Sequence, residues 1–264
     1  MMSGKELLNS TVSIATEVGA FIRKERSRFS WDHVTYKAQN DMVSYVDKEA
    51  EKQLVEALSR LLPSAGFITE EKTTEQRDAE YRWIVDPLDG TTNFIHGIPC
   101  YSVSIALAKG KEIVLGVIYE VSRDESFSAY KGYGAQLNGE SIQVSRRNSL
   151  RDSLFITGLP VSRFAQKENY LAIIPELMER THGLRRLGSA ATDLAYVACG
   201  RAEGFYECNL NPWDVAAGAL IVQEAGGTVT DFKGSDDYLF GKEIVAGCAV
   251  QSDLLSIIQK HWNK

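Results

Sequence analysis

Two aspartates within the stretch Asp86-Pro87-Leu88-Asp89-Gly90 are the side chains in this sequence best suited to chemistry. They follow a short apolar run, Trp83-Ile84-Val85, which predicts a strand that leads into the motif. Paired carboxylates bind hard divalent cations, and free backbone amides at the start of a helix bind phosphate. Taken alone, the motif is more typical of a plain turn, because proline fixes φ and glycine tolerates unusual dihedral angles.

The surrounding residues favour a binding site over a plain turn. We expect Asp86 to cap a helix whose first residue is Pro87, where the missing N–H has no cost. Asp89 then lies one turn further along on the same side, so that the two carboxylates converge. The amides of residues 90–92 stay unpaired at this helix start. The carboxylates alone would repel a phosphate, so the two features act together only with a metal bound.

Further acidic residues are candidates for the same site. Glu70 and Glu71 follow the apolar run at residues 66–68, as the end of a strand would present them, although a charged loop explains them equally well. Asp214 lies in the first turn of an apolar helix expected over residues 213–225, where the helix dipole alone would favour it.

Two amphipathic helices are expected before these motifs. Apolar residues at helical spacing predict one over about residues 4–28 and a second that ends before Pro63. Asp41 and Asp47 bracket the start of the second helix, and capping explains Asp41. Strand patterns dominate after it, with Asn138-Gly139 as a hairpin turn. Strands that follow one another closely pair antiparallel, because parallel pairing needs a long crossover.

The pattern changes near residue 150. From there, short apolar strands alternate with helical stretches, which indicates an α/β half with crossover helices. We predict two closely packed subdomains, residues 1–150 and residues 151–264. The first holds an antiparallel sheet, two long helices and most of the acidic candidates, and the second holds Asp214. The expected helices of the second half lie near residues 164–180, 190–199, 213–225 and 251–262.

Composition excludes several classes of protein. The 264 residues are 44% apolar and 24% charged, which excludes a disordered chain. The 35 acidic residues exceed the 29 basic ones, and the net charge of −6 argues against a nucleic-acid partner. Four scattered cysteines without a C-x-x-C pair favour reduced thiols. We find no signal peptide and no apolar run long enough to span a membrane, so we expect a cytoplasmic protein without membrane association.

Two long motifs together resemble the signatures of the inositol monophosphatases. One is the aspartate motif extended to Asp-Pro-Leu-Asp-Gly-Thr-Thr-Asn-Phe, and the other begins at Trp213-Asp214 and continues to Gly226-Gly227. The resembling segments in chain order are residues 41–47, 70–71, 86–94, 186–191, 213–218 and 224–227. The resemblance covers about residues 5–260. It implies an α/β (α+β) fold, a layered αβαβα sandwich.

The same resemblance implies a Mg²⁺-dependent phosphomonoesterase with two or three ions per active site. One ion would be held by Glu70, Asp86 and the backbone carbonyl of Leu88. The second would be held by Asp86, which bridges the two ions, together with Asp89 and Asp214. A ligand set of oxygen atoms without His or Cys agrees with Mg²⁺ rather than zinc.

By resemblance, Thr91 orients the attacking water, with Asp47 behind it, and Glu70 shares the role of base. The amides of Gly90 and Thr91 would bind phosphate oxygens. His96, close to the motif, is interpreted as a structural histidine. The other residues expected to bind substrate are Asp89, Gly188, Ser189, Ala190 and Glu207.

The implied reaction is the hydrolysis of myo-inositol 1-phosphate to inositol and phosphate by metal-activated water, in a lithium-sensitive homodimer. The alternative keeps this chemistry for 3′-phosphoadenosine 5′-phosphate, fructose 1,6-bisphosphate or histidinol phosphate, although Thr92-Asn93 resembles the inositol branch. In every case the partner is a small phosphorylated metabolite. A function of another class also stays open, namely regulatory binding to a macromolecule such as RNA polymerase.

Overall fold

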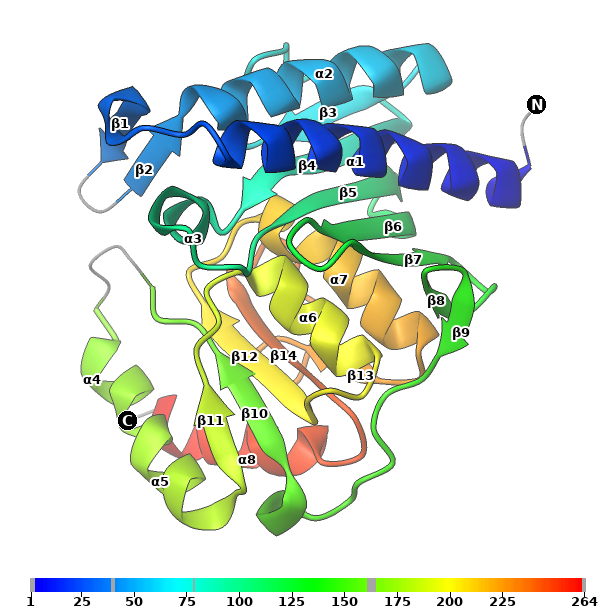
Figure 1. Cartoon of the computed structure of the whole chain (residues 1–264). Coiled ribbons are helices and arrows are strands. Elements are labelled where there is room, and N and C mark those ends of the chain that lie inside the picture. Colours follow the sequence, from blue (N-terminus) through cyan, green and yellow to red (C-terminus); the bar gives the residue numbers. More distant parts are fainter. Residues whose placement is uncertain (1–2, 39–40, 78, 161–164, 263–264) are drawn as a thin grey trace.

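The computed structural model of the chain describes residues 3–38, 41–77, 79–160 and 165–262. Its elements form five layers in which helices and sheets alternate (Figure 1). The helical layers are, in order, α1 (Gly4–Arg26) with α2 (Tyr45–Leu61), α6 (Ala190–Ala198) with α7 (Pro212–Glu224), and α4 (Lys167–Leu171), α5 (Ile173–Arg180) and α8 (Gln251–Trp262). The layered αβαβα sandwich predicted from the sequence is confirmed.

A seven-stranded sheet fills the second layer, beneath α1 and α2. Its strands lie side by side in chain order, and all neighbours are antiparallel except the first pair. Asn138 and Gly139 both have positive φ, as the predicted hairpin turn requires. The strands are β3 (Gly66–Thr69), β4 (Tyr81–Asp89), β5 (Ser102–Lys109), β6 (Glu112–Glu120), β7 (Glu125–Tyr130), β8 (Ala135–Leu137) and β9 (Glu140–Ile142).

A five-stranded sheet fills the fourth layer and has mixed directions. In spatial order, the first two pairs of neighbouring strands are parallel and the last two pairs are antiparallel. The strands, in spatial order, are β11 (Gly183–Arg185), β10 (Leu154–Thr157), β12 (Gly204–Cys208), β14 (Glu243–Gly247) and β13 (Thr228–Thr230).

Helix α7 is apolar on all sides because it lies between the two sheets. Every residue from 215 to 222 is buried. The cluster of buried side chains around α6 and α7 includes Ile84 and Ile118 of the first sheet and Phe205 and Ile244 of the second. The two halves of the chain therefore share one hydrophobic core.

The start of α2 differs from the prediction. Ser44 is the N-cap of this helix, and its amide donates to the carboxylate of Asp47 at 2.9 Å. Asp41 instead begins β2 (Asp41–Ser44), which pairs with β1 (Val34–Ala38) in a hairpin that the sequence analysis missed. Capping by Asp41 is therefore wrong, because Asp41 lies three residues before Ser44, the residue that occupies the N-cap position.

The helix expected near residues 164–180 is two short helices, α4 and α5. Pro175 cannot donate a backbone hydrogen bond to the preceding turn, which accounts for the break before α5. Residues 161–164 lie outside the described part of the chain. Short 3₁₀ helices occur at Trp31–His33 and Leu150–Asp152. Among the helices of the described ranges, none combines the length and the apolar character needed to cross a membrane.

Candidate active site

Strand β4 continues through the aspartate motif instead of ending before it. Asp86 pairs with Ser104 and Asp89 pairs with Ser102, so β4 has one extra residue between the two pairs. Such a β-bulge changes the direction of the side chains that flank it. Pro87 is tolerated at the bulge because a ladder hydrogen bond from its nitrogen is not needed there.

The helix that follows the bulge starts later than expected. α3 (Thr91–His96) has Gly90 as its N-cap, with a φ of 91° that favours glycine. Asp86 does not cap a helix that begins at Pro87; this prediction is wrong because pairing with β5 holds both residues in the strand. The amide of Phe94 donates to the carbonyl of Gly90 at 3.0 Å, so the preceding amides lie outside the helical ladder, as expected.

Asp86, Asp89 and Asp214 bring three carboxylates together. One oxygen atom from each lies within 4.8 Å of the other two. Asp214 reaches the cluster from the other half of the chain, in the first turn of α7. It also accepts a hydrogen bond from the amide of Asn211 at 2.7 Å. The residue therefore stabilises the helix start, as the alternative interpretation held, and contributes to the cluster as well.

Burial and mutual repulsion disfavour the charged forms of these groups. The pKa of Asp86 lies well above its ordinary value, first because of burial and then because of Glu70, Asp89 and Asp214. Burial raises the pKa of Asp89 to about 6, and burial and the neighbouring carboxylates raise that of Asp214 well above its ordinary range. A divalent cation would supply the positive charge that this cluster lacks, and carboxylate oxygens are the donors that Mg²⁺ prefers.

Glu70 lies beside this cluster, at the end of β3 as predicted. Its charge raises the pKa of Asp86. The loop that follows is held by Glu51, a fully buried residue of α2 that the sequence analysis missed. The carboxylate of Glu51 accepts hydrogen bonds from the amides of Glu71 and Thr73, each at 2.7 Å. Glu51 therefore fixes the path of the chain immediately after Glu70.

Thr91 and Asp47 are joined by a hydrogen bond. The Thr91 hydroxyl donates to Oδ1 of Asp47 at 2.8 Å and also lies 3.0 Å from the carbonyl of Leu88. The other carboxylate oxygen of Asp47 accepts from the Ser44 hydroxyl at 2.7 Å. Burial raises the pKa of Asp47, and the hydrogen bonds from Ser44 and Thr91 lower it. While Thr91 donates its proton to Asp47, its oxygen retains lone pairs that can accept a hydrogen bond from water.

A cavity of about 120 Å³ opens beside the carboxylates. All the residues predicted for the alcohol side of the substrate line it, together with Gly158 and Leu210, which were not predicted. Two of its lining residues, Asp89 and Asp214, also belong to the carboxylate cluster. The lining consists of Asp89, Gly158, Arg186, Gly188, Ser189, Ala190, Glu207, Leu210 and Asp214.

Ser189 orients a carboxylate of the opposite half. Its hydroxyl donates to Oδ2 of Asp89 at 2.6 Å, and the amide of Ala191 donates to the same oxygen at 2.7 Å. Both donors belong to the start of α6. The position of Asp89 therefore depends on contacts between the two halves of the chain.

Glu207 of β12 lines the cavity. Its side chain is only 9% exposed, and burial raises its pKa to about 8. The guanidinium of Arg186 lowers this pKa and the carboxylate of Asp89 raises it. Glu207 and Arg186 thus give the cavity a hydrogen-bond acceptor and a donor.

Two further predictions concern residues outside this cavity. His96 is exposed at the end of α3, where its ring packs edge-on against Trp31 with 4.9 Å between centroids. This position agrees with a structural role. All four cysteines are free thiols, as expected from their spacing.

The sequence as a whole matches one family of proteins. The match to the Inositol monophosphatase family covers residues 4–263. The chain belongs to the inositol monophosphatase family. The resemblance inferred from the motifs is thereby confirmed over nearly the full length of the chain.

Named members of this family are similar to the chain over nearly their whole length. The inositol-1-monophosphatase of Mesorhizobium japonicum is 42% identical, over 98% of this chain and 98% of its own. The Nus factor SuhB of Pseudomonas aeruginosa is also 42% identical, over 97% of this chain and 96% of its own. The chain is therefore equally similar to a relative named as an inositol-1-monophosphatase and to one named as a Nus factor.

Solved structures of the family have the same fold. The extragenic suppressor protein suhB of Bartonella henselae superposes with a TM-score of 0.90 at 42% identity, covering 96% of this chain and 98% of its own. The IMPase of Thermotoga maritima superposes with a TM-score of 0.87 at 32% identity, covering 96% of each chain.

Replacing Asp89 with Asn should leave the family fold intact and reduce phosphatase turnover by roughly 10²-fold or more. The amide can still accept from Ser189 and Ala191, but it cannot neutralise a cation. Turnover, Mg²⁺ affinity by calorimetry and thermal unfolding should be measured beside Asp152→Asn, an exposed aspartate remote from the cavity. Near-normal turnover at ordinary Mg²⁺ concentrations would mean that residues 86–90 form a plain structural turn and not a metal site.

The metal-free protein should become less stable as the pH rises from about 5 to 8.5. Asp89 and Glu207 bind protons more tightly in the native than in the unfolded state, so their contribution is present at low pH and is lost above their raised pKa values of about 6 and about 8. In EDTA, the Tm should fall by roughly 5–10 °C over this range. Asp89→Asn should reduce the fall, whereas a Tm that rises with pH would contradict the assignment.

Proposed function

We propose that this protein hydrolyses small phosphate monoesters with the help of Mg²⁺. The observation that carries the proposal is the convergence of Asp86, Asp89 and Asp214 beside a cavity lined by polar groups. A cluster of buried and partly buried carboxylates without a cation is destabilising, so a purely structural role does not account for it. Two of its members line a small cavity, which agrees with the activity that the family name describes.

Glu70, Asp86, Asp89 and Asp214, with the carbonyl of Leu88, would hold the divalent ions. When bound, these ions supply positive charge that stabilises the charge developing on the phosphoryl oxygens and the leaving oxygen. The residues present fit this function, because they offer oxygen donors without a His or Cys among them.

Thr91 and Asp47 would position the attacking water. The Thr91 hydroxyl donates to Asp47, which leaves its oxygen free to accept a hydrogen bond from that water. Asp47, held by two hydrogen bonds from Ser44, keeps the hydroxyl in this orientation. The amides of Gly90 and Thr91 would donate to phosphate oxygens, and Glu70 would share the role of proton acceptor.

The alcohol of the substrate would lie in the 120 Å³ cavity, against Glu207. In its ionised form, which predominates above its raised pKa of about 8, Glu207 accepts hydrogen bonds from the hydroxyls of a polyol and repels a second phosphate. This favours myo-inositol 1-phosphate over fructose 1,6-bisphosphate or 3′-phosphoadenosine 5′-phosphate. The similarity to the inositol-1-monophosphatase of Mesorhizobium japonicum supports the same substrate.

Phosphate release should be measured with inositol, sugar, nucleotide and histidinol phosphates. We expect the highest kcat/KM for myo-inositol 1-phosphate, loss of activity in EDTA, recovery with Mg²⁺, and inhibition by lithium at high substrate concentration. Undiminished hydrolysis after EDTA treatment would contradict the metal mechanism. A higher kcat/KM for a bisphosphate would contradict the polyol substrate while leaving the chemistry in place.

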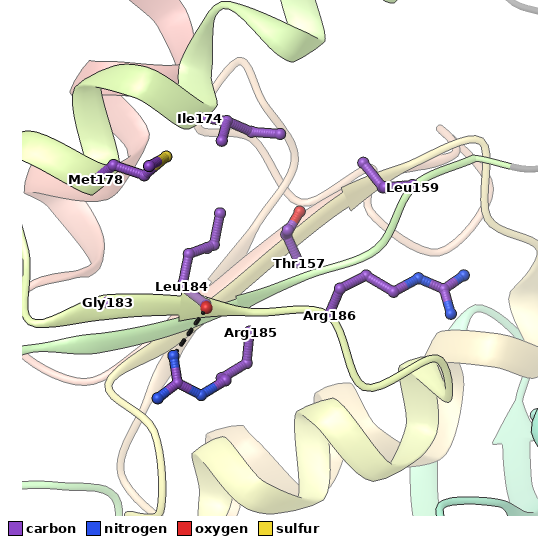
Figure 2. A pocket seen from close by; sticks show the side chains of 8 residues that line it. All are labelled: Thr157, Leu159, Ile174, Met178, Gly183, Leu184, Arg185 and Arg186. Atoms are coloured by element: carbon purple, nitrogen blue, oxygen red, sulfur yellow. Dashed lines mark hydrogen bonds between the residues drawn. The ribbon is translucent and has the colours of Figure 1, made fainter. Parts of the chain in front are cut away.

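A second candidate function is protein binding in transcription, because several relatives are named Nus factor SuhB. An exposed apolar groove of about 450 Å³ lies between α5 and strands β10 and β11. Figure 2 shows Ile174 and Met178 of α5 facing Leu184 across this groove. Met178 and Leu159 are 68% and 43% exposed, which is unusual for large apolar side chains without a partner. We propose that a protein of the transcription machinery covers this groove.

Met178→Glu should abolish binding to purified RNA polymerase without changing phosphatase activity, because it places a charge in the groove but not in the cavity. Tyr133→Glu is the matched control, since Tyr133 is equally exposed but lies in the other half of the chain. Binding and oligomeric state should be followed by light scattering. If Met178→Glu converts a homodimer to a monomer, the groove is an interface between copies of this chain. If neither polymerase binding nor oligomeric state changes, the groove is excluded as a docking surface.

A further inference from the structure

Residue 158, immediately after β10, is a glycine, and its backbone conformation does not require one. It is not among the residues with positive φ, so other residues could adopt its conformation. A Cβ atom at this position would lie 1.9 Å from Cδ and 1.9–2.0 Å from both carboxylate oxygens of Glu207. The absent side chain therefore leaves the space that the Glu207 carboxylate occupies.

A buried tyrosine fixes the backbone on both sides of this contact. The hydroxyl of Tyr170, from α4, donates to the carbonyl of Gly158 at 2.9 Å and lies 2.9 Å from the Thr157 hydroxyl. The Thr157 hydroxyl in turn lies 2.9 Å from the carbonyl of Tyr206, the residue before Glu207. These bonds tie the end of β10 to the neighbouring strand β12, where Thr157 is paired with Tyr206.

The cavity depends on this arrangement for its shape and polarity. Gly158 and Glu207 both line it, together with Asp89 and Asp214. Moving the carboxylate away from Gly158 would direct it further into a cavity of only about 120 Å³ or displace β12. Either change would alter the place where the alcohol of a substrate binds. Neither would displace Thr91, the residue proposed to position the attacking water.

We propose that Gly158, supported by Tyr170, is a specificity-determining position that seats the Glu207 carboxylate for recognition of alcohols with neighbouring hydroxyl groups. The inference rests on the proposed phosphatase function and adds to it the residues that hold the alcohol-side acceptor in place. Gly158 and Tyr170 are positioning residues, because they act through Glu207.

A double-mutant cycle between Gly158→Ala and Glu207→Ala tests this directly. In the wild-type background, Gly158→Ala should raise KM for myo-inositol 1-phosphate by roughly tenfold or more, as expected for the loss of a charged hydrogen-bond acceptor. It should change kcat/KM for p-nitrophenyl phosphate by less than about twofold. In the Glu207→Ala background the extra methyl group has room, so the same substitution should have little further effect.

Gly183→Ala provides the matched control on the adjacent strand β11. A Cβ atom there would lie 3.2 Å from the end of the flexible Arg185 side chain and in ordinary contact with Leu154 at 3.6 Å. Tyr170→Phe removes the supporting hydroxyl and keeps the ring, and it should raise KM for the polyol substrate by a few-fold with the same selectivity. Thermal unfolding of every variant separates loss of fold from loss of selectivity.

The possible outcomes are distinguishable. Equal losses on both substrates, or an undiminished effect of Gly158→Ala in the Glu207→Ala background, would mean that Gly158 serves only packing and would overturn the inference while the phosphatase stands. Wild-type protein that hydrolyses no phosphate monoester would overturn the proposed function, and this inference with it. Coupling confined to the polyol substrate would support both.

Discussion

Like-charge repulsion among the carboxylates of Asp86, which is buried, and of Asp89 and Asp214, which are partly buried, is the constraint on which the rest of the structure depends. In a flexible chain, three such groups within 4.8 Å would move apart. Here each is held by a different element: Asp86 by strand pairing in β4, Asp89 by a hydrogen bond of 2.6 Å from Ser189, and Asp214 by the first turn of α7. The free energy that opposes the repulsion comes from burial of apolar surface in the surrounding layers. The site is thus a region of local instability stabilised by the packing around it.

Helix α7 connects that packing to the site. A helix between two sheets must be apolar on every side, and residues 215–222 satisfy this condition. Its first turn, by contrast, carries the carboxylate of Asp214. The hydroxyl of Ser104 on β5 donates to the carbonyl of Trp213 at 3.1 Å, which ties the start of the helix to the sheet that carries the bulge. One helix therefore sets both the separation of the sheets and the position of Asp214.

Features of the fold and site that depend on local patterns could be predicted from the sequence, and those that depend on tertiary pairing could not. The apolar pattern of α7 and the contiguous acidic motifs are visible in the chain itself. The helix start at Pro87 was wrong because local capping preference gave way to pairing with β5. Glu51 lies one helical turn after Asp47 and on the same face, but a charged residue in an amphipathic helix is normally exposed, so its burial was missed. Gly158 has no local signal at all, because the reason for it is the carboxylate of Glu207 on another strand.

The hydrogen bonds from Ser189 and Ala191 to Asp89 run from the start of α6 to the end of β4 and so join the two halves of the chain. Cation affinity and the docking of the two halves are therefore thermodynamically linked: a change that favours one favours the other by the same factor. A molecule that clamps the halves together, even far from the carboxylates, would act as an activator by raising cation affinity. A molecule that wedges them apart would act as an inhibitor, and neither would need to enter the substrate cavity.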